Sequence, residues 1–276
     1  MNRINKYREP GVAGTFYSRD KLILERELSM LLEAAPVINL PNSIQAIIVP
    51  HAGYLFSGGV AARAYSQLLN RDFKRVVVIA PSHQETFDFV SIFNGIGYRT
   101  PIGDIQIDEP LCRKLADLSG IVRFSEQGHS SAEHSLEVQL PFLQWCLPEF
   151  RLIPVVMGSQ DEKLIQELSH LLSEVLSPEE TLMVASTDLS HKHPDQKARR
   201  LDEAAVQAIN AFDDVQLMKD VREGRIEMCG SGPAVVSMRV ARNLGARHSR
   251  VLLYRNSGDI TGNFKEVAGY LAAVIY

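Results

Sequence analysis

The chain has 276 residues and a formal net charge of −4, with 45% hydrophobic and 22% charged residues. This is ordinary globular composition, and the length can bury the core of one large α/β domain or two modest ones. The charge gives no electrostatic footprint for nucleic acid or an anionic membrane, and the longest apolar run, residues 268–275, is too short to cross a bilayer.

The cysteine content and the amino-terminal residues suggest a compartment. Cys112, Cys146 and Cys229 are widely spaced, odd in number and form no CxxC pair, which argues against a disulfide framework. The first ten residues lack the apolar core of a signal peptide. We therefore expect a cytoplasmic protein with reduced thiols.

Strand-like and helix-like segments alternate along the first half of the chain. An amphipathic helix begins near Asp20, and residues 43–50 form an apolar run typical of a buried strand. A helix is predicted over 59–69 and a strand over 75–81, so that one strand–helix–strand unit places these two strands as neighbours. Residues 87–107 indicate an added hairpin or mixed edge. Ser130 and Glu133 have capping-box spacing, which predicts a helix beginning after Ser130.

The second half of the chain continues the alternation. Strands are predicted at 151–157, 181–186, 250–254 and 266–275, and helices near 162–176, 195–212 and 232–244. Continuous apolar strands separated by helices favour a largely parallel or mixed central sheet flanked by helices. The sequence shows neither a linker nor a repeat, so we expect a single α/β domain over residues 1–276.

Three predicted strands end in polar residues. The first runs into His51, the second into His83, and the strand at 181–186 into Asp188 and His191. Ligands of open α/β sheets sit outside the carboxyl ends of parallel strands, so these groups are expected at one edge of the sheet. A single histidine after a strand is more often a capping or core residue than a ligand, but four groups at one edge favour a shared site. Asp188 either caps the next segment or orients a ligating imidazole.

Cys229 lies in the Gly-rich segment 228–233, directly before a predicted helix. A helix N-terminus lowers the pKa of a thiol and the glycines expose its sulfur, so metal ligation is as good an interpretation of Cys229 as the usual role of a buried small hydrophobe. The buried role is expected for Cys112 and Cys146. The sequence contains no GxSxG, P-loop, GxGxxG or HExxH motif. The remaining histidines that we expect at the surface are His170, His193 and His248.

Five motifs, in order over most of the chain, resemble the Memo family, whose prokaryotic members are called AmmeMemoRadiSam system protein B. They are PHAGY at 50–54, APSH at 80–83, EHSLEVQLPF at 133–142, STDLSH at 186–191 and CGSGP at 229–233. The resemblance implies a fold like that of class III extradiol dioxygenases, which are non-haem iron enzymes. It also implies a functional link to radical-SAM and AMMECR-type proteins.

Carried over residue by residue, the resemblance implies metal ligands at His51, His83 and Cys229. It places a catalytic histidine at His191, which would act as general base toward a substrate hydroxyl, with Asp188 beside it. The family motifs further imply that three residues line the same cleft: Tyr54, Glu133 and His134.

The chain departs from the dioxygenases at the third ligand. They use a carboxylate there, whereas Cys229 offers a softer thiolate that also suits Cu(I) or Zn(II). Asp188 and Glu133 remain alternatives to Cys229 as a ligand. Ser231 and Gly232 follow where animal Memo proteins carry bulkier basic residues, so the phosphopeptide-adaptor role of those proteins is not carried over.

The sequence thus predicts an iron- or copper-dependent redox protein, with zinc as a further option and no organic cofactor, acting on an unknown small molecule. The alternative is a non-enzymatic metal-handling or partner- and peptide-binding module that uses the same cleft. His191 favours the enzyme, because a metal store needs no base. Cys229 favours the alternative, because a thiolate beside iron and O₂ is itself oxidisable.

Overall fold

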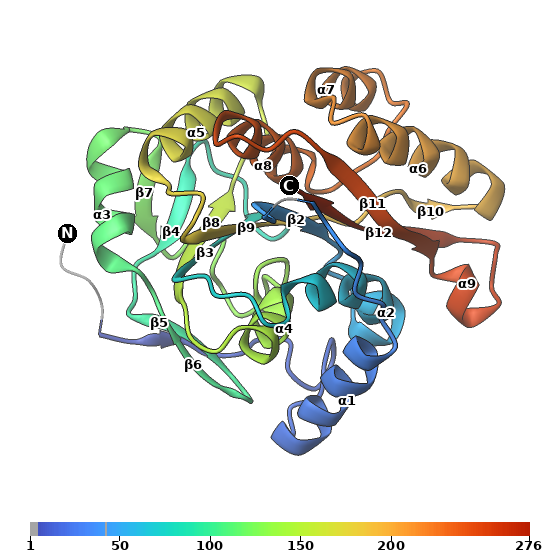
Figure 1. Ribbon diagram of the computed structural model, residues 1–276, viewed down its shortest axis with the longest axis horizontal. Helices are drawn as coiled ribbons and strands as arrows, with labels where there is room; N and C mark the ends of the chain where they lie inside the picture. The colour runs from blue at the N-terminus through green and yellow to red at the C-terminus, as the bar shows by residue number, and fades with distance from the viewer. Residues whose placement is uncertain (1–4, 42) are drawn as a thin grey trace.

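A mixed β-sheet runs through the molecule with helices on both of its faces (Figure 1). The computed structural model describes residues 5–41 and 43–276. Residues 1–4, which belong to the amino-terminal segment that we compared with a signal peptide, lie outside the described part. Within the described ranges, no helix combines the length and apolar character needed to cross a membrane.

Four parallel strands form the middle of the sheet: β2 (Ala46–Val49), β9 (Thr181–Ser186), β3 (Arg75–Pro81) and β8 (Arg151–Met157). They are hydrogen-bonded in that order, and nearly all of their residues are buried, as expected for strands covered on both faces. The prediction that the strands before His51 and His83 are neighbours is wrong, because β9 lies between them. The strand that ends at Asp188 therefore occupies the middle position.

Antiparallel strands extend the sheet at both sides. On one side β12 (Val267–Ile275) pairs with β2 and carries β11 (Ser249–Asn256) and β10 (His191–His193). On the other side β4 (Val90–Phe93) is antiparallel to β8 and parallel to β7 (Val122–Ser125). A separate small sheet contains β1 (Tyr7–Arg8), β5 (Gly97–Thr100) and β6 (Gly103–Gln106). The β-rich segment 87–107 thus supplies both a mixed edge and a hairpin, as predicted.

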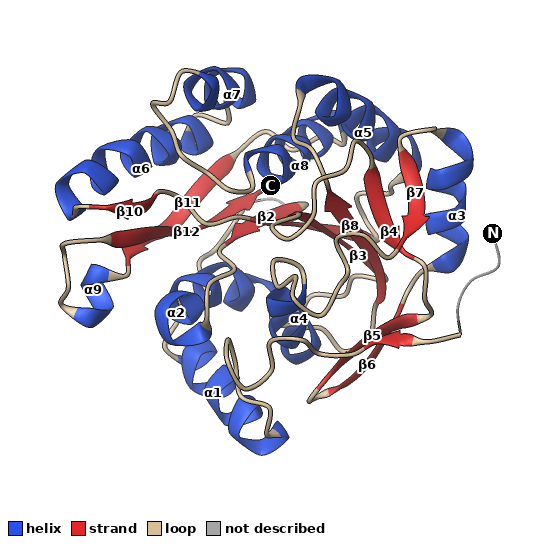
Figure 2. Ribbon diagram, turned by 180° about the vertical axis from the view of Figure 1, so that it is seen from behind, coloured by secondary structure: helices blue, strands red, loops and turns tan. Residues whose placement is uncertain are grey.

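Two helical layers cover the sheet (Figure 2). One layer contains α3 (Glu109–Leu118), α5 (Glu162–Val175), α6 (Asp195–Asn210), α7 (Asp214–Arg222) and α8 (Ser231–Asn243). The opposite layer contains α1 (Lys21–Glu33), α2 (Tyr54–Tyr65) and α4 (Leu140–Cys146). The short elements are η1 (Ser66–Leu68), η2 (Glu137–Gln139) and α9 (Gly258–Thr261). The predicted single α/β domain with a mixed, helix-flanked sheet is confirmed.

Aspartate side chains cap the starts of three helices. The carboxylates of Asp20, Asp108 and Asp161 accept hydrogen bonds from backbone N–H groups in the first turns of α1, α3 and α5. The prediction of a helix that begins directly after Ser130 is wrong. Residues 131–136 form turns and α4 begins only at Leu140, because the Glu133 carboxylate binds N–H groups of two different segments instead of capping a helix.

Candidate metal centre

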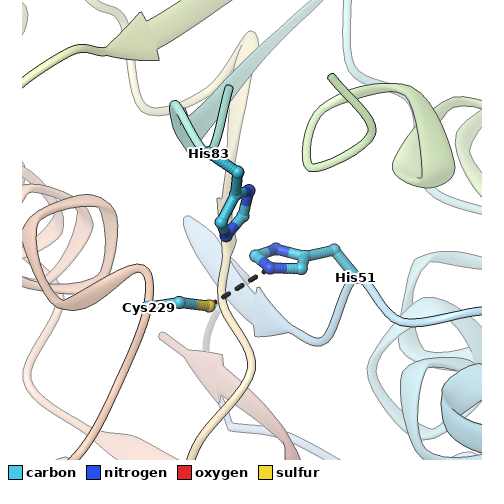
Figure 3. Close-up of side chains that lie close together, drawn as sticks. All are labelled: His51, His83 and Cys229. Carbon is cyan, nitrogen blue, oxygen red and sulfur yellow. Dashed lines mark hydrogen bonds between the residues drawn. The ribbon is translucent and has the colours of Figure 1, made fainter. Parts of the chain in front are cut away.

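Three segments that are distant in the sequence bring three metal-ligating side chains together (Figure 3). His51 is the second residue after β2, His83 is the second residue after β3, and Cys229 precedes α8. Their ligating atoms all lie within 4.8 Å of one another, and the Cys229 Sγ is 3.1 Å from the His51 Nε2. His51 is buried, Cys229 half-buried and His83 exposed, so the group opens toward solvent on one side.

The hydrogen bonds of Ser186 fix the tautomer of His51. The Ser186 hydroxyl donates its proton to the Ser135 carbonyl at 2.6 Å, so its oxygen accepts from the His51 Nδ1, 2.9 Å away. The His51 Nε2 is therefore left without a proton and faces the Cys229 sulfur. Burial lowers the pKa of His51 to about 4, which outweighs the opposite effect of the Asp188 carboxylate. His51 is thus neutral, the form in which imidazole binds metals.

Glu133 orients His83 in the same way. Its Oε1 is 3.2 Å from the His83 Nδ1, and its carboxylate accepts backbone N–H bonds from His83, His134 and Ser135. Burial raises the pKa of Glu133, but these hydrogen bonds outweigh it and hold the pKa well below its usual range. An ionised carboxylate only accepts, so Nδ1 of His83 donates and Nε2 remains free for a metal. Because both Glu133 oxygens already accept several hydrogen bonds, we interpret Glu133 as a support for a ligand.

His134 completes a cluster of imidazoles around the group. Its ring stacks on His83 with centroids 5.0 Å apart and meets His51 edge-on at 5.4 Å. The ring of Phe16 packs against it at 4.7 Å. Burial lowers the pKa of His134 and outweighs the Glu133 carboxylate, so the ring is mostly neutral at pH 7.

Cys229 differs from the expectation of a lowered thiol pKa. Burial, reinforced by the Asp188 carboxylate, raises the pKa of Cys229 to about 12, which outweighs the N–H bond from Asp188 to Sγ at 3.1 Å. Without a cation the sulfur is therefore a neutral thiol at pH 7. A bound divalent metal removes that proton, because a coordinating thiol is deprotonated outright.

The donor set fits a transition metal. Two imidazole nitrogens and one sulfur converge, and bonds of about 2.0–2.3 Å require such a spacing between ligands. Imidazole and thiolate together suit zinc, copper and iron, whereas magnesium and calcium prefer oxygen ligands. The chemistry of these residues therefore points to a soft or borderline metal ion.

Comparison with known proteins assigns the chain to a family. A family model described as Memo-like protein matches residues 8–274. The chain belongs to the Memo family. A MEMO1 family protein of Aquifex aeolicus is 36% identical over 270 residues, covering 98% of this chain and 99% of the relative. One of Methanothermobacter thermautotrophicus is 34% identical over 272 residues, covering 95% and 98%. The resemblance inferred from the five motifs is confirmed.

Asp188 and His191 lie beside the candidate ligand group of His51, His83 and Cys229 rather than within it. The buried Asp188 Oδ1 accepts the His51 backbone N–H at 2.8 Å, and its Oδ2 is 3.8 Å from the Nε2 of His191. Burial raises the pKa of Asp188, but the interactions with His51 and His191 outweigh it and lower the pKa overall. The same carboxylate raises the pKa of His191, whose side chain is 46% exposed. Asp188 thus couples an exposed imidazole to the backbone of a candidate ligand.

Tyr54 is placed in the packed interior. Its hydroxyl donates to the Val138 carbonyl at 2.8 Å, and its ring packs on Phe142 at 4.9 Å. His193 was expected to face solvent, but it is partly buried and its Nε2 lies 2.8 Å from Glu227. Other expectations are confirmed: His170 and His248 are exposed, and Cys112 and Cys146 are buried on helices.

Sequence reasoning missed the residues that hold the ligands in place. Ser186 and Gln139 form the network behind His51, with the Gln139 amide donating to the Ser186 hydroxyl at 2.8 Å and to the Pro50 carbonyl at 2.9 Å. Both lie inside the quoted motifs, so their polar character in buried segments was an available signal. Gln160 holds the turn at Cys229 in place. Its side-chain N–H donates to the Cys229 carbonyl, and its side-chain oxygen accepts from the Gly232 N–H. No motif contains Gln160, and only the fold reveals it.

Proposed function

We propose that this Memo-family protein binds iron or copper through His51, His83 and Cys229 and performs redox chemistry on a small molecule. The observation that carries the proposal is the convergence of two oriented imidazoles and one thiol within 4.8 Å. A bound metal would supply redox capacity and Lewis acidity at this position. Zinc suits the same donors but has no redox chemistry.

The protein's own residues prepare this site for a metal and a substrate. Ser186 and Glu133 hold the two imidazoles with Nε2 free, and the fold brings Cys229 to them before any metal arrives. The exposed side of the group, at His83, leaves access for a substrate. His191, paired with Asp188, is the candidate general base that accepts a proton from a substrate hydroxyl.

The proposal also carries an expectation about cellular context. Reduced thiols at Cys112, Cys146 and Cys229 fit the cytoplasm, where a functional link to radical-SAM and AMMECR-type proteins would operate. This part rests on cysteine usage and on the family resemblance.

Removing an imidazole tests metal binding. His51→Ala and His83→Ala should each lose stoichiometric iron or copper, measured by elemental analysis of protein purified without added metal. Both positions lie after strand ends rather than within a strand or helix, so circular dichroism should show an intact fold. His170→Ala, on the exposed face of α5, is the matched control and should retain wild-type metal. Metal content unchanged in both variants would refute the ligand assignment.

The third ligand separates an enzyme from a binding module. Cys229→Asp rebuilds the two-histidine, one-carboxylate site of non-haem iron enzymes, so it should bind Fe(II) and consume O₂ with a catechol faster than wild type. We expect weak or no ring cleavage from wild type. If neither protein consumes O₂, and His191→Ala changes only the binding of a partner, the non-enzymatic module is the correct reading.

A further inference from the structure

A carboxylate lies in the middle of the buried face of α6. Ala198, Ala205 and Ile209 share that face, and Asp202 stands among them fully buried. An apolar residue would continue the pattern at this position, because a buried carboxylate is costly unless hydrogen bonds replace the water that it loses. In the described part of the chain, its hydrogen-bond partners are uncharged donors rather than a lysine or an arginine. Packing alone therefore does not explain Asp202.

Two donors from different segments hold the Asp202 carboxylate. Its Oδ1 accepts the Ser190 N–H at 3.0 Å, and its Oδ2 accepts the Tyr254 hydroxyl of β11 at 2.7 Å. Burial raises the pKa of Asp202, and these two hydrogen bonds act in the opposite direction. Because both partners donate, the ionised carboxylate, which only accepts, satisfies both of them. The side chain thus connects α6 and β11 to the loop between β9 and β10.

Strand β12 holds the same loop from another side. The Leu189 N–H donates to the Gly269 carbonyl at 2.8 Å, and the Gly269 N–H donates to the Ser190 carbonyl at 2.9 Å. A Cβ at residue 269 would overlap the Oδ2 of Asp202, so a side chain there would displace the carboxylate. Helix α6 lies beside β10, β11 and β12 (Figure 1). Three elements therefore fix the peptide that joins Leu189 to Ser190.

The fixed peptide carries both members of the pair that lies beside the ligand group. Asp188 stands directly before Leu189, and His191 directly after Ser190. The Asp188 Oδ2 lies 3.8 Å from the His191 Nε2, a separation that a small rotation of this peptide would change. Strand β10 has three residues, and its register to β12 shifts at Lys192, whose φ is +58°. Such a short, irregular ladder gives His191 little orientation of its own.

We propose that Asp202 is a positioning residue, which sets the geometry of the Asp188–His191 pair by holding the Ser190 N–H. Tyr254 fixes the carboxylate, and Gly269 leaves room for it. Asp202 acts through the backbone rather than by contact with reacting atoms. The inference deepens the proposed function and rests on it only for the role of His191 as a base.

NMR titration of the His191 ring in metal-free protein tests the proposal without a substrate. The ring signals, assigned by their loss in His191→Ala, give its pKa, which the hydrogen bond and charge of Asp188 raise. Asp202→Ala removes the acceptor of the Ser190 N–H, so the pKa of His191 should fall toward the ordinary value of 6.5. Asp202→Asn keeps an acceptor oxygen at this position and should restore most of the wild-type pKa.

Two further variants separate positioning from a general loss of stability. Gly269→Ala forces the carboxylate away from its place, so it should lower the pKa of His191 as Asp202→Ala does. Asp108→Ala removes another buried carboxylate, which accepts the Leu111 N–H at the start of α3, and should leave the pKa of His191 unchanged.

The results that would overturn the proposal are distinct. One is a pKa of His191 that is the same in wild type, Asp202→Ala and Gly269→Ala. Another is an equal fall in Asp202→Ala and Asp108→Ala, which would indicate general loosening of the fold. An equal fall in Asp202→Asn and Asp202→Ala would show that the charge acts on His191 rather than the hydrogen bond. If Asp202→Ala does not fold, Tyr254→Phe takes its place, and an unchanged pKa there and in Gly269→Ala refutes the positioning role.

Failure of the proposed function gives a different result. Wild type that binds no Co(II), used as the probe metal, would refute the metal site. The titration of His191 in metal-free protein would still show whether Asp202 positions the Asp188–His191 pair.

Discussion

The proton positions on two histidines determine whether they can bind a metal. His51 donates through Nδ1 to the Ser186 oxygen, and His83 donates through Nδ1 to the Glu133 carboxylate. Each hydrogen bond leaves Nε2 as the free acceptor. Because the supports are a buried hydroxyl and a buried carboxylate with further partners of their own, the two tautomers persist without metal.

The pH dependence of turnover should report His191. Its interaction with Asp188 raises its pKa above the ordinary value of 6.5, so the neutral form that accepts a proton predominates only at higher pH. The kcat of any identified substrate should therefore rise with pH, with a midpoint above 6.5. His191→Ala should lower kcat by about 10²–10⁴-fold and keep metal occupancy near wild type.

The Asp188→Asn variant tests the cause of that pKa. Asn retains the oxygen that accepts the His51 N–H but removes the charge, so the midpoint of the pH profile should move to lower pH. If the midpoint does not move, Asp188 is not the cause of the raised pKa of His191. The effect of pH on stability has the opposite sign to its effect on turnover. The Asp188–His191 pair contributes fully to the free energy of unfolding below the unfolded-state pKa of His191, and this contribution is lost as the pH rises through the folded-state pKa.

At the level of elements, a buried ion pair joins the amino-terminal segment to the loop that carries Glu133. Arg8, at the end of β1, pairs with Glu137 and donates to the carbonyls of Ser130 and Glu133 at 2.9 and 2.6 Å. Glu137 in turn accepts from the Gly11 N–H and the Tyr17 hydroxyl at 2.9 and 2.6 Å. The pair therefore connects the loop that carries Gly11 and Tyr17 with Glu133, the support of His83.

Removing the arginine should destabilise the fold. Both side chains are almost fully buried, so Arg8→Met leaves an unpaired buried carboxylate and should cost about 3–5 kcal/mol in the free energy of unfolding, measured by urea denaturation at pH 7. The double variant Arg8→Met, Glu137→Gln removes that charge and should recover part of the loss. If Arg8→Met lowers the free energy of unfolding by less than about 1 kcal/mol, the ion pair is solvated and contributes little to stability.

At the level of the whole molecule, the metal should couple distant parts of the chain. His51, His83 and Cys229 converge only in the folded state, so the unfolded chain offers no comparable site. Fe(II) at about 100 times its dissociation constant, added anaerobically, should stabilise the protein by about 2.7 kcal/mol. For a chain of this length that corresponds to a rise in Tm of roughly 5 °C by calorimetry.

Matched variants check that stabilisation. His83→Ala should show no rise in Tm with Fe(II), whereas His170→Ala should respond like wild type. An equal rise in wild type and His83→Ala would place the stabilising metal elsewhere on the protein.

The α/β class, most of the elements and the closeness of His51, His83 and Cys229 were predictable from sequence, because strand ends and motif residues carry local signals. His51, His83 and Asp188 each stand two residues after a buried strand, and such ends share an edge of the sheet. The role of Glu133 was misread, since its spacing from Ser130 mimics a capping box. A capping pattern specifies one local partner, and Glu133 instead binds His83 across the fold.

The sequence by itself determined the family, the alternation of strands and helices, and which side chains are able to ligate a metal. Only the tertiary structure decided the order β2-β9-β3, the supporting contacts of Ser186 and Gln160, and the raised thiol pKa of Cys229. The physical reason is that hydrophobic periodicity and motif chemistry act over a few residues. Hydrogen-bond partners and desolvation depend instead on segments that are more than a hundred residues apart, such as those of His51 and Ser186.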